Sequence, residues 1–535
     1  MSSDAAVETP APRRKTRWWL PLGVGVLVVA AWGGIWAYPD ETLDVGSRRM
    51  FTIMSGFLGL ALMLLWLWLL SGLGWKLRLG SFLLVVVVAG AAVASVRRVN
   101  FTGDMQPTFV FRWQTTGDTL LDQHLRAAAG NTEPLPPIDL AVGPLDILEY
   151  RGASRDGVTN GPALARDWAD ESPTAIWRQP VGGGYGAFIV VGNCAYSLEQ
   201  RHGEECVVCY DTASGRQRWV HGYAERFSEA LGGVGPRATP TFYQGHVYSL
   251  GAGGRLVCLN AESGEPVWKQ NMLELAGGDN LRWGQSGSPL VVDDRVYIAC
   301  GPETAPPAKG SVMAVDATTG DLIWASGDYK GGYASPVIVD LAGTRQLLVF
   351  EGVGMTAYNP DDGAQLWHFP WTSDFDINAA QPLVVDEYHV LITSNKGAAL
   401  LHVAQADGQW SAEAKWRNNR LKAHYACVVM HEGYVYGLDV GILTCLDLET
   451  GKPAWKGGRY GHGQMLLRDD LLIVLSESGE LALVAATPDS HQELGRIQAI
   501  EGKTWNNPTL VGDRIFIRND LEMACYELPL AAAFE

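Results

Sequence analysis

A short pattern with fixed internal spacing recurs five times in this chain. Each copy has an Asp or Asn, a Gly four residues later and a Trp four residues after that. The copies are Asp211/Gly215/Trp219, Asn260/Gly264/Trp268, Asp316/Gly320/Trp324, Asn359/Gly363/Trp367 and Asp447/Gly451/Trp455. Each follows a short alternating segment, so the Asp or Asn can bond its own backbone while the Gly supplies positive φ. The sequence therefore predicts one β-hairpin, repeated along the chain.

Short polar or Pro-containing steps mark the entry to a further strand before each hairpin. They are Thr239-Pro240, Ser288-Pro289, Ser335-Pro336, Gln381-Pro382 and Asn507-Pro508, with degenerate versions at Ala426-Cys427 and Gly463-Gln464. Together with an opening strand over 187–198 they make eight entries. Hairpins that recur at intervals of about 40 to 56 residues are typical of a radially repeated sheet. We therefore expect an all-β, eight-bladed β-propeller.

The two ends of the repeat region are incomplete in complementary ways. The last copy, over 520–528, lacks its Trp strand, whereas the first Trp strand, around Trp177, precedes any complete blade. Because ring closure removes free sheet edges, we expect the strand around Trp177 to complete the blade begun at Asn507. The repeat Trp side chains should pack against the neighbouring blade and bond a backbone group through the indole N–H. This structural set is Trp177, Trp219, Trp268, Trp324, Trp367, Trp416 and Trp455.

Three apolar stretches without charged residues lie near the amino terminus, at about 18–38, 51–73 and 79–96. Each is long enough to span roughly 30 Å of hydrocarbon. They follow a polar tail over 1–17 and precede a linker over 97–146 with a weakly helical patch, after which the propeller body extends over 147–535. The sequence thus predicts a propeller preceded by three transmembrane helices.

The basic residues around these stretches give the expected orientation. Four lie in the tail and two, Lys76 and Arg78, in the second loop, whereas the opposite side has four, diluted by acidic residues. This bias favours a cytoplasmic amino terminus. An odd number of spans then places the propeller on the periplasmic side of the inner membrane, as part of a multi-pass protein.

Most of the acidic residues lie outside the membrane segment. The first hundred residues hold ten of the 41 Lys and Arg but only five of the 58 Asp and Glu. The body is therefore strongly acidic, which argues against nucleic acid as a partner because phosphate binding needs a basic surface.

The pair Cys206 and Cys209 has redox or zinc spacing, but no second pair lies near it, so we interpret these cysteines as residues that pack within the strands.

A central funnel can also be predicted. The innermost strand of each blade lines the channel of a propeller, and we expect it to precede the Pro-containing entry. We take one polar or aromatic residue from each blade at this position and add Glu199 and Lys503, which lie nearby in sequence. Such a ring of residues is typical of a binding pocket. The same groups could instead bond one another or channel water. The candidates are Tyr185, Glu199, Arg237, Gln285, Tyr333, Asn378, His424, His462, Lys503 and Trp505.

Residues 314–324, Ala-Val-Asp-Ala-Thr-Thr-Gly-Asp-Leu-Ile-Trp, resemble the tryptophan-docking repeat of quinoprotein alcohol dehydrogenases and of the assembly scaffold BamB. The segment from Tyr150-Arg151-Gly152 through Asp156-Gly157, followed by Trp168 and Trp177, resembles the entry segment of bacterial PQQ-like (pyrrolo-quinoline quinone) repeat proteins. The resemblance covers 147–535 and implies the eight-bladed fold. It does not specify the chemistry.

Two functions follow from this resemblance. The first is a membrane-anchored propeller that binds or scaffolds a protein or an envelope component. The alternative is a PQQ-dependent alcohol or sugar dehydrogenase that donates electrons to membrane quinone. The quinoprotein family implies PQQ and Ca²⁺ in the funnel and, in many members, a disulfide between adjacent cysteines.

This chain has no Cys-Cys dipeptide, and it offers only Glu199, Gln285 and Asn378 as oxygen donors in the ring. We identify no catalytic residues and no metal site, and PQQ with Ca²⁺ is expected only under the alternative. A third possibility is the sensing of a small ligand with transmission through the spans.

Overall fold

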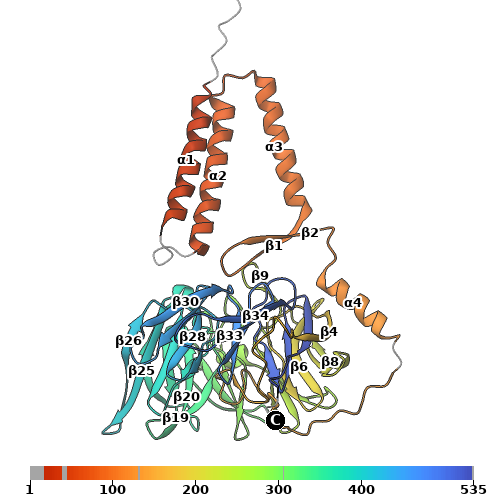
Figure 1. Cartoon of the computed structure of the whole chain (residues 1–535), viewed down its shortest axis with the longest axis vertical. Helices are drawn as coiled ribbons and strands as arrows, with labels where there is room; N and C mark the ends of the chain where they lie inside the picture. Colours follow the sequence, from red (N-terminus) through yellow and green to blue (C-terminus); the bar gives the residue numbers. More distant parts are fainter. Residues whose placement is uncertain (1–16, 39–44, 131–132, 305, 533–535) are drawn as a thin grey trace, which may run out of the picture. The chain divides into compact units, whose positions relative to one another are not determined.

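The computed structural model describes residues 17–38, 45–130, 133–304 and 306–532, so nearly all of the tail predicted over 1–17 lies outside the described residues. Two compact units are formed, Met1–Gln114 and Thr115–Glu535. The first contains the predicted apolar helices and the second the predicted propeller (Figure 1).

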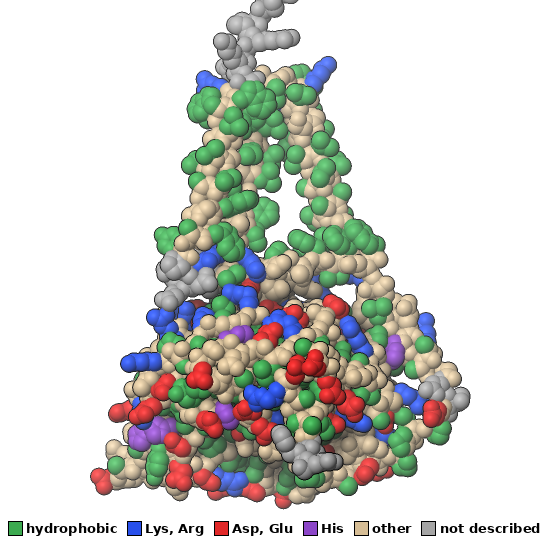
Figure 2. Space-filling model, in the orientation of Figure 1, with side chains coloured by type: hydrophobic (Ala, Val, Ile, Leu, Met, Phe, Trp, Pro, Cys, Tyr) green, Lys and Arg blue, Asp and Glu red, His purple; other side chains and the backbone are tan. Residues whose placement is uncertain are grey.

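The first unit contains helices α1 (Trp19–Ala37), α2 (Val45–Leu69) and α3 (Trp75–Ser95), followed by a hairpin of β1 (Val96–Phe101) and β2 (Pro107–Phe111). All three helices are long and apolar enough to cross a membrane. Helices α1 and α2 lie side by side (Figure 1), joined by bonds from Trp32 to Ser55 and from Trp36 to Thr52. The helices present apolar side chains along their length, whereas the visible side of the propeller carries charges of both signs (Figure 2).

The second unit contains eight sheets that form the blades of a propeller. Blades 1 and 2 contain β5 (Ile189–Val191), β6 (Cys194–Arg201), β7 (Glu204–Asp211) and β8 (Gln217–Tyr223), then β11 (Thr241–Tyr243), β12 (His246–Leu250), β13 (Arg255–Asn260) and β14 (Pro266–Asn271). Blades 3 and 4 contain β15 (Leu290–Val292), β16 (Arg295–Ala299), β17 (Val312–Asp316) and β18 (Leu322–Ser326), then β19 (Val337–Leu341), β20 (Thr344–Glu351), β21 (Gly354–Tyr358) and β22 (Gln365–Pro370).

Blades 5 and 6 contain β23 (Leu383–Val384), β24 (His389–Ser394), β25 (Gly397–Ala406) and β26 (Gln409–Asn418), then β27 (Val429–His431), β28 (Tyr434–Asp439), β29 (Ile442–Asp447) and β30 (Pro453–Arg459). Blades 7 and 8 contain β31 (Gln464–Arg468), β32 (Leu471–Leu475), β33 (Glu480–Ala485) and β34 (Glu493–Gln498) with β3 (Val158–Thr159), then β35 (Thr509–Val511), β36 (Arg514–Arg518), β37 (Glu522–Glu527) and β4 (Thr174–Pro180). Smaller elements are α4 (Gly117–Ala128), in the predicted helical patch, β9 (Ser228–Glu229), β10 (Gly233–Val234), α5 (Met272–Ala276) and η1 (Asp374–Asp376).

The ring closes where the sequence predicted it to close. Strand β4 pairs antiparallel with β37, with Trp177 opposite Cys525, so the first Trp strand completes the last blade. The order of strands within a blade differs from the expectation in one respect. The inner strand follows the Pro-containing entry, as β11 follows Pro240, and the predicted ring residues other than Glu199, which lies in β6, are therefore in the loops that lead into the inner strands.

The repeated hairpin forms for the reasons its residues suggest. The carboxylate of Asp316 accepts the N–H groups of Thr318 and Thr319, both at 2.8 Å, and Gly320 has φ of 76°. A Cβ at Gly320 would lie 2.7 Å from Cδ2 of Trp268, the repeat Trp of the preceding blade. The glycine is therefore required both by its backbone conformation and by the ring packed on it.

Most of the repeat Trp side chains bond a backbone carbonyl of the next blade. At 2.8–3.1 Å, Trp177 donates to Thr212, Trp219 to Ala261, Trp268 to Ala317, Trp324 to Pro360, Trp416 to Leu448 and Trp455 to Thr487. The indole of Trp367 differs from the expectation and donates to the side chain of Gln346 in its own blade. In the next blade the two-residue turn Asp407-Gly408 joins the long strands β25 and β26, without the spacing of the repeated hairpin. We call these contacts between neighbouring blades the seams.

The entries to the inner strands also link the blades. Ala187 N–H donates to the hydroxyl of Thr239, Thr239 N–H to Ser288 and Ser288 N–H to Ser335, at 2.9–3.0 Å. A small hydroxyl residue before Pro thus supplies an acceptor for the preceding blade, which explains why the entry pattern recurs.

Two buried arginines of the segment 149–159 tie the centre of the ring together. Arg155 donates to the carbonyls of Ser288, Pro289 and Pro336, in blade entries 3 and 4, and pairs with Glu149 at 2.8 Å. Arg151 donates to Val428, Met465 and Asn507, in blade entries 6, 7 and 8. Because these entries lie on opposite sides of the ring, the segment crosses its centre, and we call it the plug.

Candidate functional site

One end of the propeller is formed by the loops that lead from the outer strand of one blade to the inner strand of the next, and we call this end the mouth. Seven predicted ring residues that lie in these loops are Tyr185, Arg237, Tyr333, His424, His462, Lys503 and Trp505. Of these, Tyr185, Tyr333 and His462 are buried, whereas the other four are partly exposed.

Cations and aromatic rings from three of these loops meet at the mouth. The guanidinium of Arg237 lies 4.8 Å from the ring centre of Phe227 and 5.8 Å from that of Tyr185. The ammonium of Lys503 lies 3.8 Å from the ring centre of Trp505 and 5.3 Å from that of Tyr185. Both cations thus share Tyr185, and each gains from the negative face of an aromatic ring.

The cluster continues around the mouth through Tyr425, which the sequence analysis did not single out. Its ring centre lies 5.0 Å from that of Trp505 and 5.4 Å from that of His462, and His462 lies 4.9 Å from His424. The indole N–H of Trp505 donates to Glu477 at 2.8 Å. The structure therefore brings six of the predicted ring residues into one continuous set, which we call the mouth cluster: Tyr185, Arg237, His424, His462, Lys503 and Trp505, joined by Tyr425.

Among the residues that the structure describes, no carboxylate forms a salt bridge with Arg237. Its Nη1 donates to the carbonyl of Gly235 at 2.9 Å, while its buried Nη2 has no hydrogen-bond partner among the described residues. Burial lowers the pKa of Arg237, although Tyr185 and Glu229 oppose that effect. A guanidinium that is removed from water and has no carboxylate beside it is stabilised when an anionic group of another molecule binds to it.

A second group of aromatic residues lies beside Tyr333, and the sequence analysis missed it. Trp283 contacts Tyr333 and Phe375 edge to face, with ring centres 5.9 and 6.4 Å apart, and the guanidinium of Arg282 lies over Trp283 and Phe375. Phe375 is 69% exposed and holds a left-handed backbone with φ of 59°. A strained backbone that presents an aromatic side chain to solvent is typical of a binding surface. We call Arg282, Trp283, Tyr333 and Phe375 the aromatic patch.

A Trp outside the docking spacing was the one available signal for this patch. Trp283 lies two residues before the predicted Gln285 and matches no copy of the repeat. The patch also depends on Phe375, whose exposure no sequence pattern indicates.

Three predicted ring residues are held by bonds to neighbouring groups of the chain and do not join the mouth cluster. Glu199 is fully buried and binds Arg201 and Tyr210; burial alone would raise its pKa, but Arg201 and Arg518 hold it below the ordinary value. The amide of Gln285 donates to Asn280 and Gly301, and that of Asn378 donates to three carbonyls within blade 4 and the loop after it.

These positions test whether the chain fits the PQQ and Ca²⁺ of quinoproteins. A Ca²⁺ site needs several oxygen ligands around one point, with carboxylates among them. The carboxylate of Glu199 is neutralised by arginine, and the two amides lie in different blades. Within the described part of the chain, no three His, Cys, Asp or Glu residues are grouped to hold a metal ion. The residues present therefore do not fit a calcium-bound quinone.

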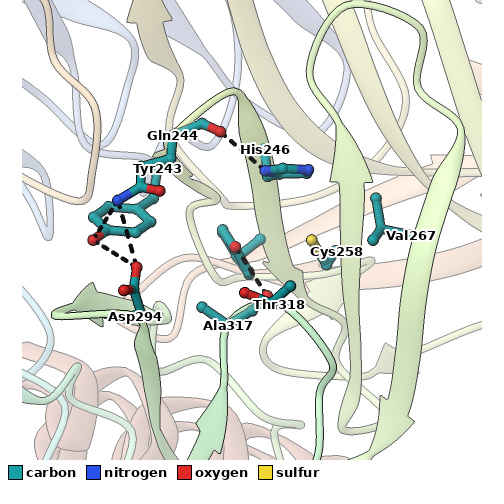
Figure 3. A pocket seen from close by; sticks show the side chains of 9 residues that line it. Tyr243, Gln244, His246, Cys258, Val267, Asp294, Ala317 and Thr318 are labelled. Carbon is teal, nitrogen blue, oxygen red and sulfur yellow. Dashed lines mark hydrogen bonds between the residues drawn. The ribbon is translucent and has the colours of Figure 1, made fainter.

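A small pocket of about 80 Å³ lies at the seam between blades 2 and 3 (Figure 3). Tyr243 and Gln244 on one side bond Asp294 on the other, and Tyr248 donates to Ala317, the carbonyl that also accepts from the repeat residue Trp268. Similar Tyr and Trp pairs bond one carbonyl at other seams, as Tyr196 and Trp219 do at Ala261. This pocket is therefore part of the blade packing.

Comparisons with known proteins agree with this architecture. Residues 203–457 match the family model described as outer membrane protein assembly factor BamB. The BamB of Moranella endobia (strain PCIT) is 25% identical over 260 residues, which are 46% of this chain and 64% of that protein, so the chain spans less than two thirds of that relative.

Among solved structures, the quinohemoprotein alcohol dehydrogenase of Comamonas testosteroni has a TM-score of 0.54 at 15% identity and covers 79% of this chain and 84% of its own. The quinohemoprotein alcohol dehydrogenase ADHIIG of Pseudomonas putida HK5 has a TM-score of 0.52 at 14% identity, covering 73% and 81%. At these identities the likeness shows the fold alone. The chain is an eight-bladed β-propeller protein that is similar to BamB in sequence over part of its length, with three apolar helices near its amino terminus.

Proposed function

We propose that this protein is a membrane-anchored scaffold whose propeller lies on the periplasmic side of the inner membrane and binds a protein partner through its mouth. The partner segment would be extended, with acidic side chains for the mouth cluster and apolar ones for the aromatic patch. The three apolar helices support the anchor, and the match to an envelope assembly factor supports a protein partner.

The observation that carries the proposal is the state of Arg237. It is a partly buried cation held over two aromatic rings, with one nitrogen unpartnered among the described residues and no carboxylate in salt-bridge contact there. Arginine and aromatic residues dominate the binding energy of protein interfaces. An acidic side chain of a partner would complete the hydrogen bonds of Arg237 and neutralise its charge.

A cysteine-labelling experiment tests the proposed orientation. All eight native cysteines are buried and none forms a disulfide, so they give little background. The side chain of Asp361, at the tip of the blade 4 hairpin, is 84% exposed. We expect Asp361→Cys in intact spheroplasts to react with a membrane-impermeant maleimide. Labelling only after lysis would place the propeller in the cytosol and overturn the orientation.

Site-specific photo-crosslinking tests the proposed binding face. A benzoylphenylalanine placed at position 375 or 283 in the full-length protein should give one common protein adduct in cells. The same probe at position 361, on an exposed hairpin of the rim, is the matched control and should not give it. Equal adducts from rim and mouth, or none from the mouth, would contradict the proposal.

The alternative function, a PQQ-dependent dehydrogenase, can be tested on the purified full-length protein. The solved quinohemoprotein structures support the fold, while Glu199, Gln285 and Asn378 do not fit a calcium site. We expect added PQQ and Ca²⁺ to give no saturable absorption change and no dye-linked oxidation of alcohols or sugars. Binding near one PQQ per chain would favour the oxidoreductase.

A further inference from the structure

Two histidines face each other on neighbouring strands of blade 5, away from the mouth. His389, the first residue of β24, is the direct cross-strand partner of His402 on β25. Their rings lie 5.0 Å apart, and Nε2 of His389 is 3.3 Å from Nδ1 of His402. His402 is exposed, whereas the His389 side chain is 18% exposed. The pair is therefore open to solvent on one side.

A carboxylate fixes the orientation of the inner histidine. Nδ1 of His389 lies 2.8 and 2.9 Å from the two carboxylate oxygens of Asp386, three residues earlier. Because a carboxylate can only accept, this contact keeps the ring proton of His389 on Nδ1 and leaves the lone pair of Nε2 facing His402. Carboxylates orient metal-binding histidines in the same way.

The separation of the two nitrogens suits one shared ion. Imidazole nitrogens bind Zn²⁺ at about 2.0–2.1 Å, so two of them at one tetrahedral or octahedral ion lie about 2.9–3.4 Å apart. The observed 3.3 Å falls within that range. A direct hydrogen bond between the rings would need a similar distance, so a binding measurement must distinguish the two.

The surroundings supply negative charge and leave coordination positions open. Glu413 on β26 stands opposite His402 and is exposed, and the ring of Tyr388 lies 6.1 Å from that of His402. No third His, Cys, Asp or Glu is in ligand position within the described ranges. The remaining positions would therefore be filled by water or by a donor from another molecule.

We propose that His389 and His402 bind one divalent transition-metal ion, with Asp386 as the residue that positions His389. Imidazole ligands select Zn²⁺, Ni²⁺ or Cu²⁺ over the hard cations Ca²⁺ and Mg²⁺. The site lies on the two middle strands of blade 5, β24 and β25, and does not depend on the proposed function of the mouth.

Titration of Ni²⁺ or Zn²⁺ into the detergent-solubilised, metal-free full chain, without a histidine tag, tests this site. We expect one ion per chain at pH 7.5, with micromolar affinity and a higher melting temperature. Mg²⁺ should give neither effect.

Substitutions assign the ion to these residues. His389→Gln or His402→Gln should weaken binding at least tenfold, and Asp386→Asn should weaken it about 10- to 100-fold. His246→Gln, at the first residue of β12 in blade 2, is the matched control because His246 starts the second strand of its blade as His389 does, and it should leave affinity and stoichiometry unchanged. Since His402 is exposed, the metal-free His402→Gln protein should have the same melting temperature as the metal-free wild type. This comparison distinguishes a loss of metal binding from a loss of folding.

An outcome in which the wild type binds no more tightly than the double variant His389→Gln/His402→Gln would overturn the site. The pair would then be an internal hydrogen bond between the two rings.

Discussion

The seams between blades and the mouth are built from similar residue types but in opposite ways. At the seams the repeat Trp side chains share one arrangement, with the ring on a glycine of the next blade in five of seven positions and the N–H on a carbonyl of the next blade in six of seven. At the mouth, Trp, Tyr and Arg contact one another without repetition, and a buried nitrogen of Arg237 has no partner in the described part of the chain. Repetition with satisfied polar groups indicates structure, whereas irregularity with unsatisfied groups indicates binding.

The plug should show the largest effect on the structural side of this comparison. We expect Arg155→Met to lower the free energy of unfolding by about 3–5 kcal/mol, because three carbonyls lose their donor and Glu149 loses its ion pair. Chemical denaturation measures this. A change under 1 kcal/mol would show that the plug is not part of the cooperative fold.

A pair of glycines isolates the contribution of a seam. Gly320 and Gly343 both have φ of 76°, but only Gly320 lies under a Trp ring, and a Cβ at Gly343 meets nothing within 4 Å. Gly343→Ala should cost about 1–2 kcal/mol from the backbone alone. Gly320→Ala should cost about 1–3 kcal/mol more, because the Trp268 ring must move. Equal melting temperatures of the two variants would show that the contact between Gly320 and the Trp268 ring does not contribute to stability.

A buried carboxyl between blades 3 and 4 should make stability depend on pH. Burial raises the pKa of Glu351 to about 7, although Ser311, Thr356 and Tyr358 bond it. Its ordinary value is 4.5. The folded state therefore keeps the proton over a range in which the unfolded chain has lost it.

The stabilising effect of that proton is complete below pH 4.5 and is lost as the pH rises towards 7. The loss should not exceed about 1.4 kcal/mol per pH unit. Glu351→Gln should flatten this part of the stability profile, measured by denaturation at several pH values. An unchanged slope would exclude Glu351 as its source.

Substitutions at the mouth should show the smallest effect on stability. Arg237→Gln and Phe375→Ala should change the free energy of unfolding by no more than about 1 kcal/mol, since neither side chain supports a blade. A loss as large as that of Gly320→Ala would mean that the mouth is a structural element and would remove the contrast with the seams.

The sequence predicted the blades and their closure because each hairpin is encoded locally. Asp316, Gly320 and Trp324 specify a turn and its docking partner within nine residues, and the missing Trp strand at 520–528 is visible beside the unpaired one at Trp177. Three apolar helices followed equally directly from composition.

The plug and part of the site could not be predicted in this way. Arg155 bonds backbone carbonyls more than 130 residues away, and backbone acceptors leave no residue pattern. Glu199 pairs with Arg201, two residues later, but the second arginine that lowers the pKa of Glu199, Arg518, is remote in sequence. Phe375 depends on a positive φ at a non-glycine residue, which the sequence does not indicate.

The crosslinking yield at position 375 after charge reversal is the most direct test of the contrast between mouth and blades. Arg237→Glu should lower the yield of the protein adduct at least tenfold. Arg345→Glu, at an exposed arginine paired with Asp293 on the rim, should leave it unchanged. An adduct that forms equally in both variants would contradict the account, because the partner would then be recognised without the cation at the mouth.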